Sequence, residues 1–305
     1  MVSITEFYSI AGPVPFINVQ VDADNRLYLD PRAVRLMEHP QPFAADAVRC
    51  ADTFLDTVTG CIFDGSPPAL RRGEALLQRF VEPWETRLGM SEAGFHGHGG
   101  AMLVGTSIWE ALTGSVEPLV RVLILHQLED LPLFVDGVDK DITSDVTTRI
   151  MFGPLARFTE HVVATHQEFS ANGHTLETVR RQVWNPDSCE WGEAEFTLPV
   201  ADGKVLLLVP TGWARPTLLM SAVRYYDTTV LSFAQMEHAV LSKDGKLLKT
   251  RKMDMRKQPG LEPGRDTILA ATLRAFENDE NLLALFKAFV DERFTRDDDE
   301  DAVAA

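Results

Sequence analysis

Apolar residues recur at helical spacing in the first part of the chain. Between residues 43 and 62 they form one stripe, which consists of Phe43, Ala47, Phe54, Leu55, Val58 and Ile62. This spacing predicts an amphipathic helix. Asp30 and Pro31 predict the start of an earlier helix, because Asp is a favoured N-cap and Pro suits the first helical position. Another helix is predicted over residues 67–82, where a helical pattern follows two prolines.

The second half of the chain mixes strand-like and helical patterns. Strands are predicted over residues 131–135, 176–184, 193–200 and 204–210. The last two are separated by Ala201-Asp202-Gly203, and the Asp-Gly pair predicts a hairpin turn. Helices are predicted from Ser144 onwards, with a disturbance at Gly153-Pro154, and over residues 217–241, 266–277 and 280–293.

These elements predict an α+β fold. It is rich in helices and contains a small, mainly antiparallel sheet flanked by long helices. Residues 1–296 are expected to form one composite domain, because no linker of flexible composition divides them. A Gly-rich stretch at 89–100 marks a sub-boundary between an N-terminal helical half and a C-terminal α+β half. The acidic tail, residues 297–305, has little to bury and is expected to be disordered.

The formal net charge of −16 disfavours nucleic-acid binding through the surface as a whole. One segment, residues 243–257, is clearly basic. It is interpreted either as a solvated strand-and-loop face or, with weaker support, as a nucleic-acid-binding surface. No apolar run approaches the ~20 residues that span a bilayer, which argues against a membrane protein.

Three cysteines without paired spacing argue against a disulfide framework and against a cysteine zinc site. The N-terminus lacks the basic start and long apolar core of a signal peptide. Together these features predict a soluble, cytoplasmic protein of bacterial type.

Four carboxylates lie close together in the sequence at Asp136, Asp139, Asp141 and Asp145. Hard cations such as Mg²⁺, Mn²⁺ and Ca²⁺ bind several oxygen ligands, so alternating Asp residues are a signal for a metal site. The EF-hand pattern fails, because its glycine position holds Ser144 and its final glutamate position holds Ile150.

An alternative explains most of these acids structurally. Ser144 would be the N-cap of the following helix, and Asp145 would interact with the helix dipole in the first turn. Asp136 suits a turn before Gly137. Asp139 and Asp141 then remain as the pair without a sufficient structural reason.

A second candidate is the stretch GFHGHGG, which contains His96 and His98. Two histidines at this spacing can bind one metal from an extended loop. The alternative is that they are ordinary polar residues of a flexible loop. Further ligands would have to come from residues such as His126, Glu129 or Asp130.

The order helix, three antiparallel strands, helix is also found in metal-dependent nucleases, which is an analogy of fold only. The nearest acid-x-Lys motif, Asp202-Gly203-Lys204, falls in the predicted turn and is explained by the turn itself.

The leading hypothesis is a metal-dependent hydrolase that acts on phosphodiesters. Asp139, Asp141 and Asp145 would be catalytic, and the ligands of Mg²⁺ or Mn²⁺ would be Asp139, Asp141, His96 and His98. The alternative is a non-catalytic protein-interaction or scaffold component with a protein partner or a second copy of itself.

Overall fold

The computed structural model describes the backbone of residues 1–23, 25–89 and 98–304, and the side chains of these residues except 98–102 and 295–304. The chain is 52% helical and 14% strand, and its sheets are small and antiparallel. The predicted α+β, helix-rich class is therefore confirmed.

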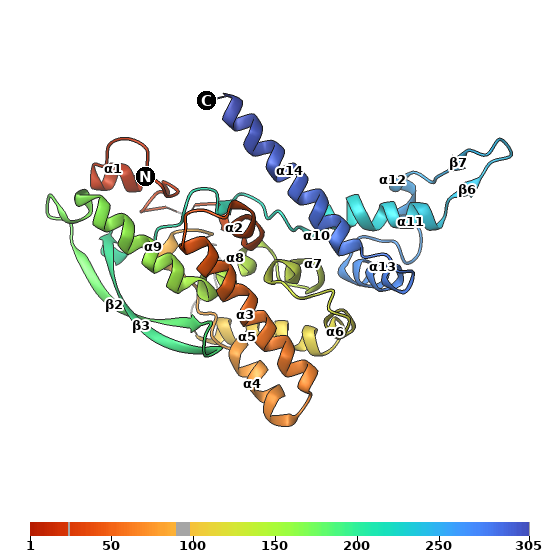
Figure 1. The fold of residues 1–305 in the computed structure, drawn as a ribbon, viewed down its shortest axis with the longest axis horizontal. Coiled ribbons are helices and arrows are strands. Elements are labelled where there is room, and N and C mark those ends of the chain that lie inside the picture. The colour runs from red at the N-terminus through yellow and green to blue at the C-terminus, as the bar shows by residue number, and fades with distance from the viewer. Residues whose placement is uncertain (24, 90–97, 305) are drawn as a thin grey trace. The chain divides into compact units, whose positions relative to one another are not determined.

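The chain divides into two compact units (Figure 1). The first consists of Met1–Glu110, His126–Glu129 and Gly137–Leu218, and the second of Ala111–Leu125, Asp130–Asp136 and Leu219–Ala305. The chain crosses between the units several times, so neither unit is one continuous segment. Whether both form one composite domain stays a prediction.

The first unit packs helices against a three-stranded sheet. Its elements are α1 (Ile4–Tyr8), β1 (Tyr28–Leu29), α2 (Pro31–Met37), α3 (Phe43–Asp64), α4 (Pro67–Leu77), η1 (Trp84–Thr86), most of α5 (His98–Thr113), α8 (Lys140–Ile150), α9 (Phe152–Thr165), η3 (Gln167–Ser170), β2 (Leu176–Asn185), β3 (Glu190–Ala201), β4 (Lys204–Val205) and β5 (Ala214–Arg215). The strand order is β2-β3-β4, and β1 pairs separately with β5.

Short sequence motifs correctly predicted the start of α2 and the turn between β3 and β4. Asp30 caps α2 by accepting hydrogen bonds from the amides of Arg32 and Ala33, and Pro31 follows at the first helical position. The turn between β3 and β4 is Asp202-Gly203, and both residues have positive φ. The N-cap at Asp30 and the hairpin turn are therefore confirmed.

The predicted strand at 204–210 ends early. Lys204 and Val205 pair with β3, and then the backbone leaves the ladder. The Leu207 amide donates to the Glu85 carbonyl oxygen at 2.8 Å, and the Leu208 amide donates to the Thr159 hydroxyl at 2.9 Å. These partners satisfy the buried backbone outside a sheet.

The second unit is mainly helical. Its elements are α6 (Glu117–Arg121), α7 (Leu131–Phe134), α10 (Ala222–Tyr225), the π-helical η4 (Tyr226–Val230), α11 (Leu231–Glu237), β6 (Val240–Leu241), β7 (Leu247–Leu248), α12 (Lys252–Met255), α13 (Arg265–Glu277) and α14 (Leu282–Ala304), while η2 (Leu128–Asp130) joins the units in sequence. Tyr225 lies at the centre of this unit. Its ring contacts Phe134 and Phe286, and its hydroxyl pairs with the Thr272 hydroxyl at 2.9 Å.

One expectation about this unit is wrong and another is not tested. Residues 131–135 were predicted as a buried strand, but Leu131–Phe134 is a short helix, α7, whose residues are all buried. A short apolar run suits a buried helix as well as a buried strand, so the pattern alone does not decide. The backbone of 297–304 is helical within α14, and the prediction that this tail is disordered in solution is not tested.

Candidate functional site

Asp139 is the N-cap of α8. One of its carboxylate oxygens accepts hydrogen bonds from the amides of Asp141 and Ile142, at 3.1 and 3.3 Å. This is the role that the sequence analysis gave to Ser144, and that assignment was wrong. Ser144 lies inside the helix, buried, and its hydroxyl accepts a hydrogen bond from the Leu29 amide at 2.9 Å.

Asp145 therefore occupies the second turn of α8 rather than the first. The pKa of its carboxyl group is raised to about 7, first by burial and then by the charges of Glu82, Asp141 and Asp139, while Arg149 acts in the opposite direction. The helix dipole acts mainly within the first turn, so it does not account for an acid at this position. An acid that is crowded in this way is a functional-site candidate.

The charge of Arg149 lowers the pKa of Asp145, but other groups share that charge. It donates to the carbonyl oxygens of Val81 and Glu82, the latter at 2.7 Å, and to the Glu85 carboxylate at 3.4 Å. Arg181 donates to the same carboxylate at 2.9 Å. Because Glu85 already partners Arg149, the arginine only partly offsets the carboxylates around Asp145.

Asp141 lies close in space to Gly89, where the Gly-rich stretch begins. A Cβ atom built on Gly89 would lie 3.7 Å from the Asp141 Oδ1 atom. Lys140, the neighbour of Asp141, places its ammonium group 4.3 Å from the centre of the Tyr28 ring. Asp141 thus lies beside the last described residue before segment 90–97.

The two predicted histidines cannot be placed against these acids. His96 lies outside the described residues, and His98 is the first residue of α5, where the side chain is not described. Within the described part of the chain, no group of three or more His, Cys, Asp or Glu side chains is arranged to hold a metal ion. Their role as metal ligands stays a prediction.

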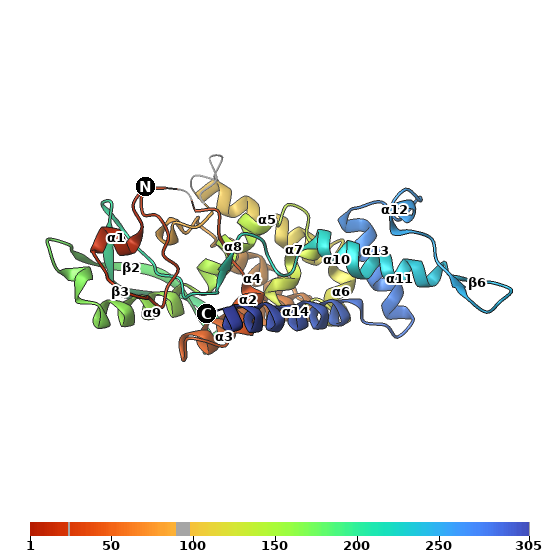
Figure 2. The same cartoon turned by 90° about the horizontal axis from the view of Figure 1, so that it is seen from above.

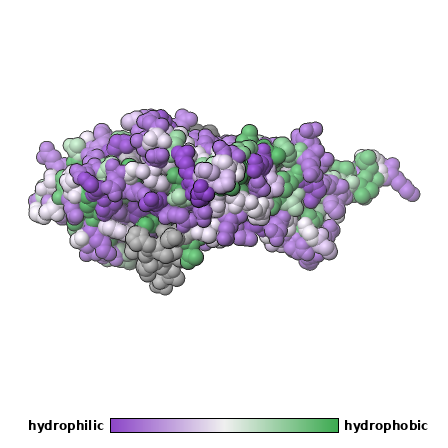
Figure 3. All heavy atoms as spheres, turned by 90° about the horizontal axis from the view of Figure 1, so that it is seen from below, coloured by the Kyte–Doolittle hydropathy of each residue, from purple (hydrophilic) through white to green (hydrophobic). Residues whose placement is uncertain are grey.

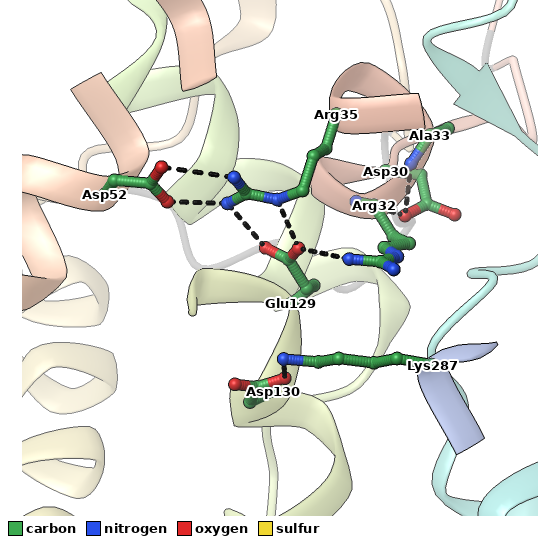
Figure 4. Close-up of polar contacts among 8 residues, drawn as sticks. All are labelled: Asp30, Arg32, Ala33, Arg35, Asp52, Glu129, Asp130 and Lys287. Carbon is green, nitrogen blue, oxygen red and sulfur yellow. Dashed lines mark hydrogen bonds and ion pairs between the residues drawn. The ribbon is translucent and has the colours of Figure 1, made fainter. Parts of the chain in front are cut away.

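Glu129, suggested as a further ligand, belongs to a buried ion-pair network that the sequence analysis missed (Figure 4). Arg35 donates to Glu129 at 2.7 Å and to Asp52 at 2.6 Å, and Arg32 lies 3.5 Å from Glu129. Arg32 and Arg35 are three positions apart on α2, so they lie on one helical face. That spacing was the only sequence signal for the network.

Asp130, the other suggested acidic ligand, forms an ion pair in the second unit. Lys287 on α14 lies 2.7 Å from its carboxylate, and both side chains are largely buried (Figure 4). Both suggested acids are therefore held by basic side chains, which leaves them poorly suited to bind a metal ion.

A groove of about 530 Å³ lies in the first unit along α2 and α3. Val34, Ala44, Ala45 and Val48 form its apolar part. None of the predicted catalytic or metal-binding residues is among the residues that line it. Asp139, Asp141 and Asp145 therefore do not belong to the groove.

A β-hairpin in the second unit carries four exposed aliphatic side chains. We call residues 240–251 the arm. In its two strands, Val240 pairs with Leu248 and Leu241 with Leu247, and these side chains are 65%, 58%, 70% and 46% exposed. Successive residues of a strand point to opposite faces, so each face of the arm carries one exposed aliphatic pair. Figure 3 shows hydrophobic side chains along a narrow projection and hydrophilic ones at its end.

The turn and base of the arm are well defined. The Gly245 amide donates to the Ser242 carbonyl oxygen at 3.0 Å, and Gly245 has a φ of 74°. At the base, Gln235 donates to the Thr250 carbonyl oxygen at 2.6 Å. Met255, just beyond the arm, is completely buried. The arm is a formed element with a fixed base.

The basic segment 243–257 is divided between two roles. Lys252 donates to the carbonyl oxygen of Asp227, and Arg256 forms an ion pair with the Asp227 carboxylate. Lys243, Lys246 and Lys249 are exposed on the arm and make no ion pair within the described residues. Only part of the segment is thus available to a partner.

Comparison with known proteins gives one match. A family model described as a domain of unknown function, DUF8370, matches residues 11–221, and no curated protein or solved structure matches the chain. The matched residues include Asp139, Asp141 and Asp145 and end before the arm. Among the described residues, no helix combines the length and the apolar character needed to cross a membrane.

Proposed function

The chain belongs to the family described as a domain of unknown function, DUF8370, and we propose that it is a non-catalytic protein-interaction component whose docking element is the arm. The observation that carries this proposal is the exposure of Val240, Leu241, Leu247 and Leu248 on both faces of a two-stranded hairpin. Such a hairpin is only marginally stable in water by itself.

A partner would gain from covering these side chains. Fully burying one Val or Leu side chain contributes roughly 1.5–3 kcal/mol, so covering these side chains would offset part of the roughly 4–15 kcal/mol that association costs. The fixed base lowers the entropy lost on binding, because the arm is ordered before it meets its partner. Three free cysteines agree with a cytoplasmic setting for this contact.

The proposal is tested by site-specific crosslinking in the native host. A diazirine-bearing residue replaces Leu247 on the arm and, in a matched control, Leu285 on α14, which is 58% exposed. We expect one dominant adduct of defined mass from position 247 and none of that mass from position 285. The protein crosslinked at position 247 is then expected to bind the purified chain. A Leu241→Thr/Leu247→Thr variant is expected to lose that binding.

Two outcomes would overturn the proposal. One is the same diffuse set of adducts from positions 247 and 285, which would mean that the arm meets other proteins only at random. The other is an adducted protein that binds the Leu241→Thr/Leu247→Thr variant as well as the unaltered chain. A circular dichroism spectrum identical to that of the unaltered chain establishes that the variant is folded.

A second candidate function is the metal-dependent hydrolysis of phosphodiesters. The crowding of Asp145 by Glu82, Asp141 and Asp139 favours it, because a bound cation would relieve their repulsion. Since the described side chains alone do not complete a metal site, His96 or His98 would supply further ligands. Mg²⁺ or Mn²⁺ would lower the pKa of a bound water that attacks phosphorus.

The hydrolase candidate has its own test. Calorimetric titration with Mn²⁺ at pH 8 is expected to give binding to the unaltered chain, at least tenfold weaker binding to Asp141→Asn, and unchanged binding to the control Asp136→Asn. The rates at which the three proteins hydrolyse a simple phosphodiester are expected to rank in the same order as their Mn²⁺ affinities. Absence of Mn²⁺ binding by the unaltered chain would remove this candidate.

A further inference from the structure

We propose that the outer edge of strand β2 pairs with β2 of a second copy of this chain, so that the sheets of two copies join into one antiparallel sheet. This inference goes beyond the proposed function, because it concerns the first unit and not the arm. In both views of the structure, β2 and β3 run side by side as a long ribbon with α9 beside it (Figures 1 and 2). The strand order β2-β3-β4 places β2 at the edge of the sheet.

The hydrogen bonding of β3 determines which backbone groups of β2 point outward. Successive residues of an antiparallel strand alternate between pairs that exchange N–H···O bonds with the neighbouring strand and pairs that do not. The Val200 amide donates to the Thr175 carbonyl oxygen at 3.1 Å, so the odd-numbered residues from Thr175 onwards bond to β3. The even-numbered residues point their N–H and C=O groups away from β3. These are Leu176, Thr178, Arg180, Gln182 and Trp184.

Two contacts of Thr197, which lies opposite Thr178, confirm this alternation. The Thr197 amide donates to the Glu160 carboxylate at 2.9 Å, so it points away from β2. The hydroxyls of Thr178 and Thr197 lie 3.0 Å apart. This proximity is expected, because side chains are closer in pairs that exchange no backbone hydrogen bonds.

The outer edge of β2 is open over residues 176–182. Among the described residues, its outward groups make one hydrogen bond, in which the Arg181 guanidinium donates to the Arg180 carbonyl oxygen at 3.1 Å. The next outward residue, Trp184, is 3% exposed and its indole donates to the Thr53 hydroxyl, so the open stretch ends before it.

β2 lacks the features that normally protect a sheet edge from pairing. Monomeric proteins keep edge strands short or interrupt them with Pro, Lys or a bulge. Leu176–Asn185 is ten residues long, contains no Pro or Lys, and pairs with β3 without interruption. A typical strand has about 5–6 residues. The charges of Arg180 and Arg181 are held within the chain by Glu195 and Glu85.

The open stretch is centred on Val179, which selects the register of a two-fold contact. With the axis at Val179, Leu176 of each copy faces Gln182 of the other, and Thr178 faces Arg180. Every outward residue of the open stretch then has a backbone partner in both copies. Such a contact is isologous, because the same surface is used twice.

Charges favour the same register. Glu177 is exposed and has no ion-pair partner among the described residues, and in this register it faces Arg181 of the second copy. Arg181 shares the Glu85 carboxylate with Arg149, so two cations share one carboxylate. Glu177 of the second copy would supply another, and opposite charges across strands stabilise a sheet.

The neighbouring registers fit less well. An axis at Arg180 would place two Arg180 side chains opposite each other, and like charges in this position are destabilising. An axis at Thr178 would place Glu177 opposite Val179 and leave Gln182 outside the ladder. A strand of another protein can also extend a sheet edge, but an identical strand brings both the matching charges and the same twist.

The first test compares Thr178→Pro with Thr178→Ala. Proline removes one outward N–H group and no bond to β3, so the sheet of each chain is kept. Alanine keeps the N–H group and loses the same hydroxyl contact. Sedimentation velocity in about 0.15 M salt, which screens the net charge of each chain, measures association. The unaltered chain and Thr178→Ala are expected to dimerise alike, and Thr178→Pro at least tenfold more weakly, with unchanged circular dichroism.

The second test concerns the charge pair. Glu177→Arg places an arginine opposite Arg181 of the second copy and is expected to weaken dimerisation at least fivefold. The matched control is Glu74→Arg, which reverses an exposed acid on α4 and changes the net charge equally. It is expected to dimerise within twofold of the unaltered chain. Equal weakening in both variants would show that Glu177 does not face a cation.

The third test fixes the register by disulfide formation in a Cys189→Ser background. Thr178 and Arg180 of the second copy would form a hydrogen-bonded pair, whose Cα atoms lie about 5.5 Å apart, within the range of a disulfide. An oxidised mixture of Thr178→Cys and Arg180→Cys chains is expected to give a linked dimer, and neither variant alone is expected to do so. A linked dimer from Thr178→Cys alone would contradict the axis at Val179.

The outcomes separate this inference from the proposed function. A dimer that is lost in Thr178→Pro and kept in Leu241→Thr/Leu247→Thr supports pairing through β2. A dimer that is kept in Thr178→Pro and lost in the arm variant would overturn this inference and support docking through the arm. An unaltered chain that stays monomeric, or that is crosslinked from a diazirine-bearing residue at position 178 to another protein instead of a second copy, would also overturn this inference.

Discussion

The ammonium group of Lys252 lies 2.6 Å from the main-chain carbonyl oxygen of Asp227 and also contacts that of Thr228. Both acceptors belong to the π-helical segment η4, whose wider turns change the hydrogen bonding of the backbone. Lys252 thus ties the chain just beyond the arm to the centre of the second unit.

The first prediction follows from this contact. Lys252→Met removes the donor and keeps most of the side-chain volume, so it should lower the free energy of unfolding by about 1 kcal/mol. The amides of residues 240–251 should exchange hydrogen at least fivefold faster, because the base of the arm is released. Hydrogen-deuterium exchange with mass spectrometry measures this, with the exposed Lys257→Met as control. Equal exchange in both variants would show that Lys252 does not anchor the arm.

The second prediction concerns the cap of α8. Asp139→Ala leaves the Asp141 and Ile142 amides without their acceptor, and loss of an N-cap costs about 1 kcal/mol. Asp139→Asn keeps an acceptor and should cost much less. Urea unfolding of both variants, with Asp136→Ala as an exposed control, measures the difference. If Asn were as destabilising as Ala, the carboxylate charge rather than the cap would be the important feature.

The third prediction concerns the pH dependence of stability. The pKa of Asp145 is raised from 3.8 to about 7 in the folded protein, so between these pH values the folded state binds the proton more tightly than the unfolded state. The contribution of Asp145 to the free energy of unfolding is therefore most favourable near pH 4 and falls as pH rises to about 7. Glu82, Asp139, Asp141 and Arg149 face this group and shape the transition.

Asp145→Asn removes this titration. The variant should be more stable than the unaltered chain at pH 8, by about 1–3 kcal/mol, and the gain should vanish towards pH 4. Urea unfolding at several pH values between 4 and 8 measures this, and Asp136→Asn serves as the exposed control. A variant that is less stable than the unaltered chain at pH 8 would mean that the charged Asp145 has a stabilising partner.

Short-range signals predicted the elements that local chemistry determines. Phe43–Asp64 forms α3 because its apolar stripe repeats at helical spacing, and Asp202-Gly203 turns because both residues tolerate positive φ. The start of α8 was misassigned for a different reason. The Ser144 hydroxyl is occupied by the amide of Leu29, 115 positions away, and no local pattern reveals that contact.

The candidate sites also depend on contacts between residues that are far apart in sequence, which local patterns do not reveal. Asp145 was expected to be explained by the helix dipole, but its raised pKa depends on burial and on Glu82, which lies far away in sequence. The segment 243–257 was noticed for its charge, whereas the hairpin was missed, because Val240 and Leu241 were included in the helix predicted over residues 217–241 and form strand β6 instead. The sequence around Asp244-Gly245, with Val240-Leu241 before it and Leu247-Leu248 after it, contains a hairpin signal that charge alone obscured.

The last prediction concerns the buried carboxylate of Glu85, which is only 1% exposed. It accepts hydrogen bonds from both Arg149 and Arg181. Glu85→Gln keeps the shape of the side chain and removes its charge, so two neighbouring arginines lose their counter-charge. Breaking a buried pair from one side costs about 3–5 kcal/mol, and the partial exposure of Arg181 brings our expectation to about 3 kcal/mol.

Urea unfolding at pH 7 measures this loss, and Glu193→Gln is the matched control, because Glu193 pairs with Arg180 at an exposed site and at 3.8 Å. The control should change the free energy of unfolding by less than about 0.5 kcal/mol. The loss should also be smaller in an Arg181→Met background, since one of the two stranded charges is then absent. Equal losses in both backgrounds would show that Arg181 and Glu85 are not energetically coupled.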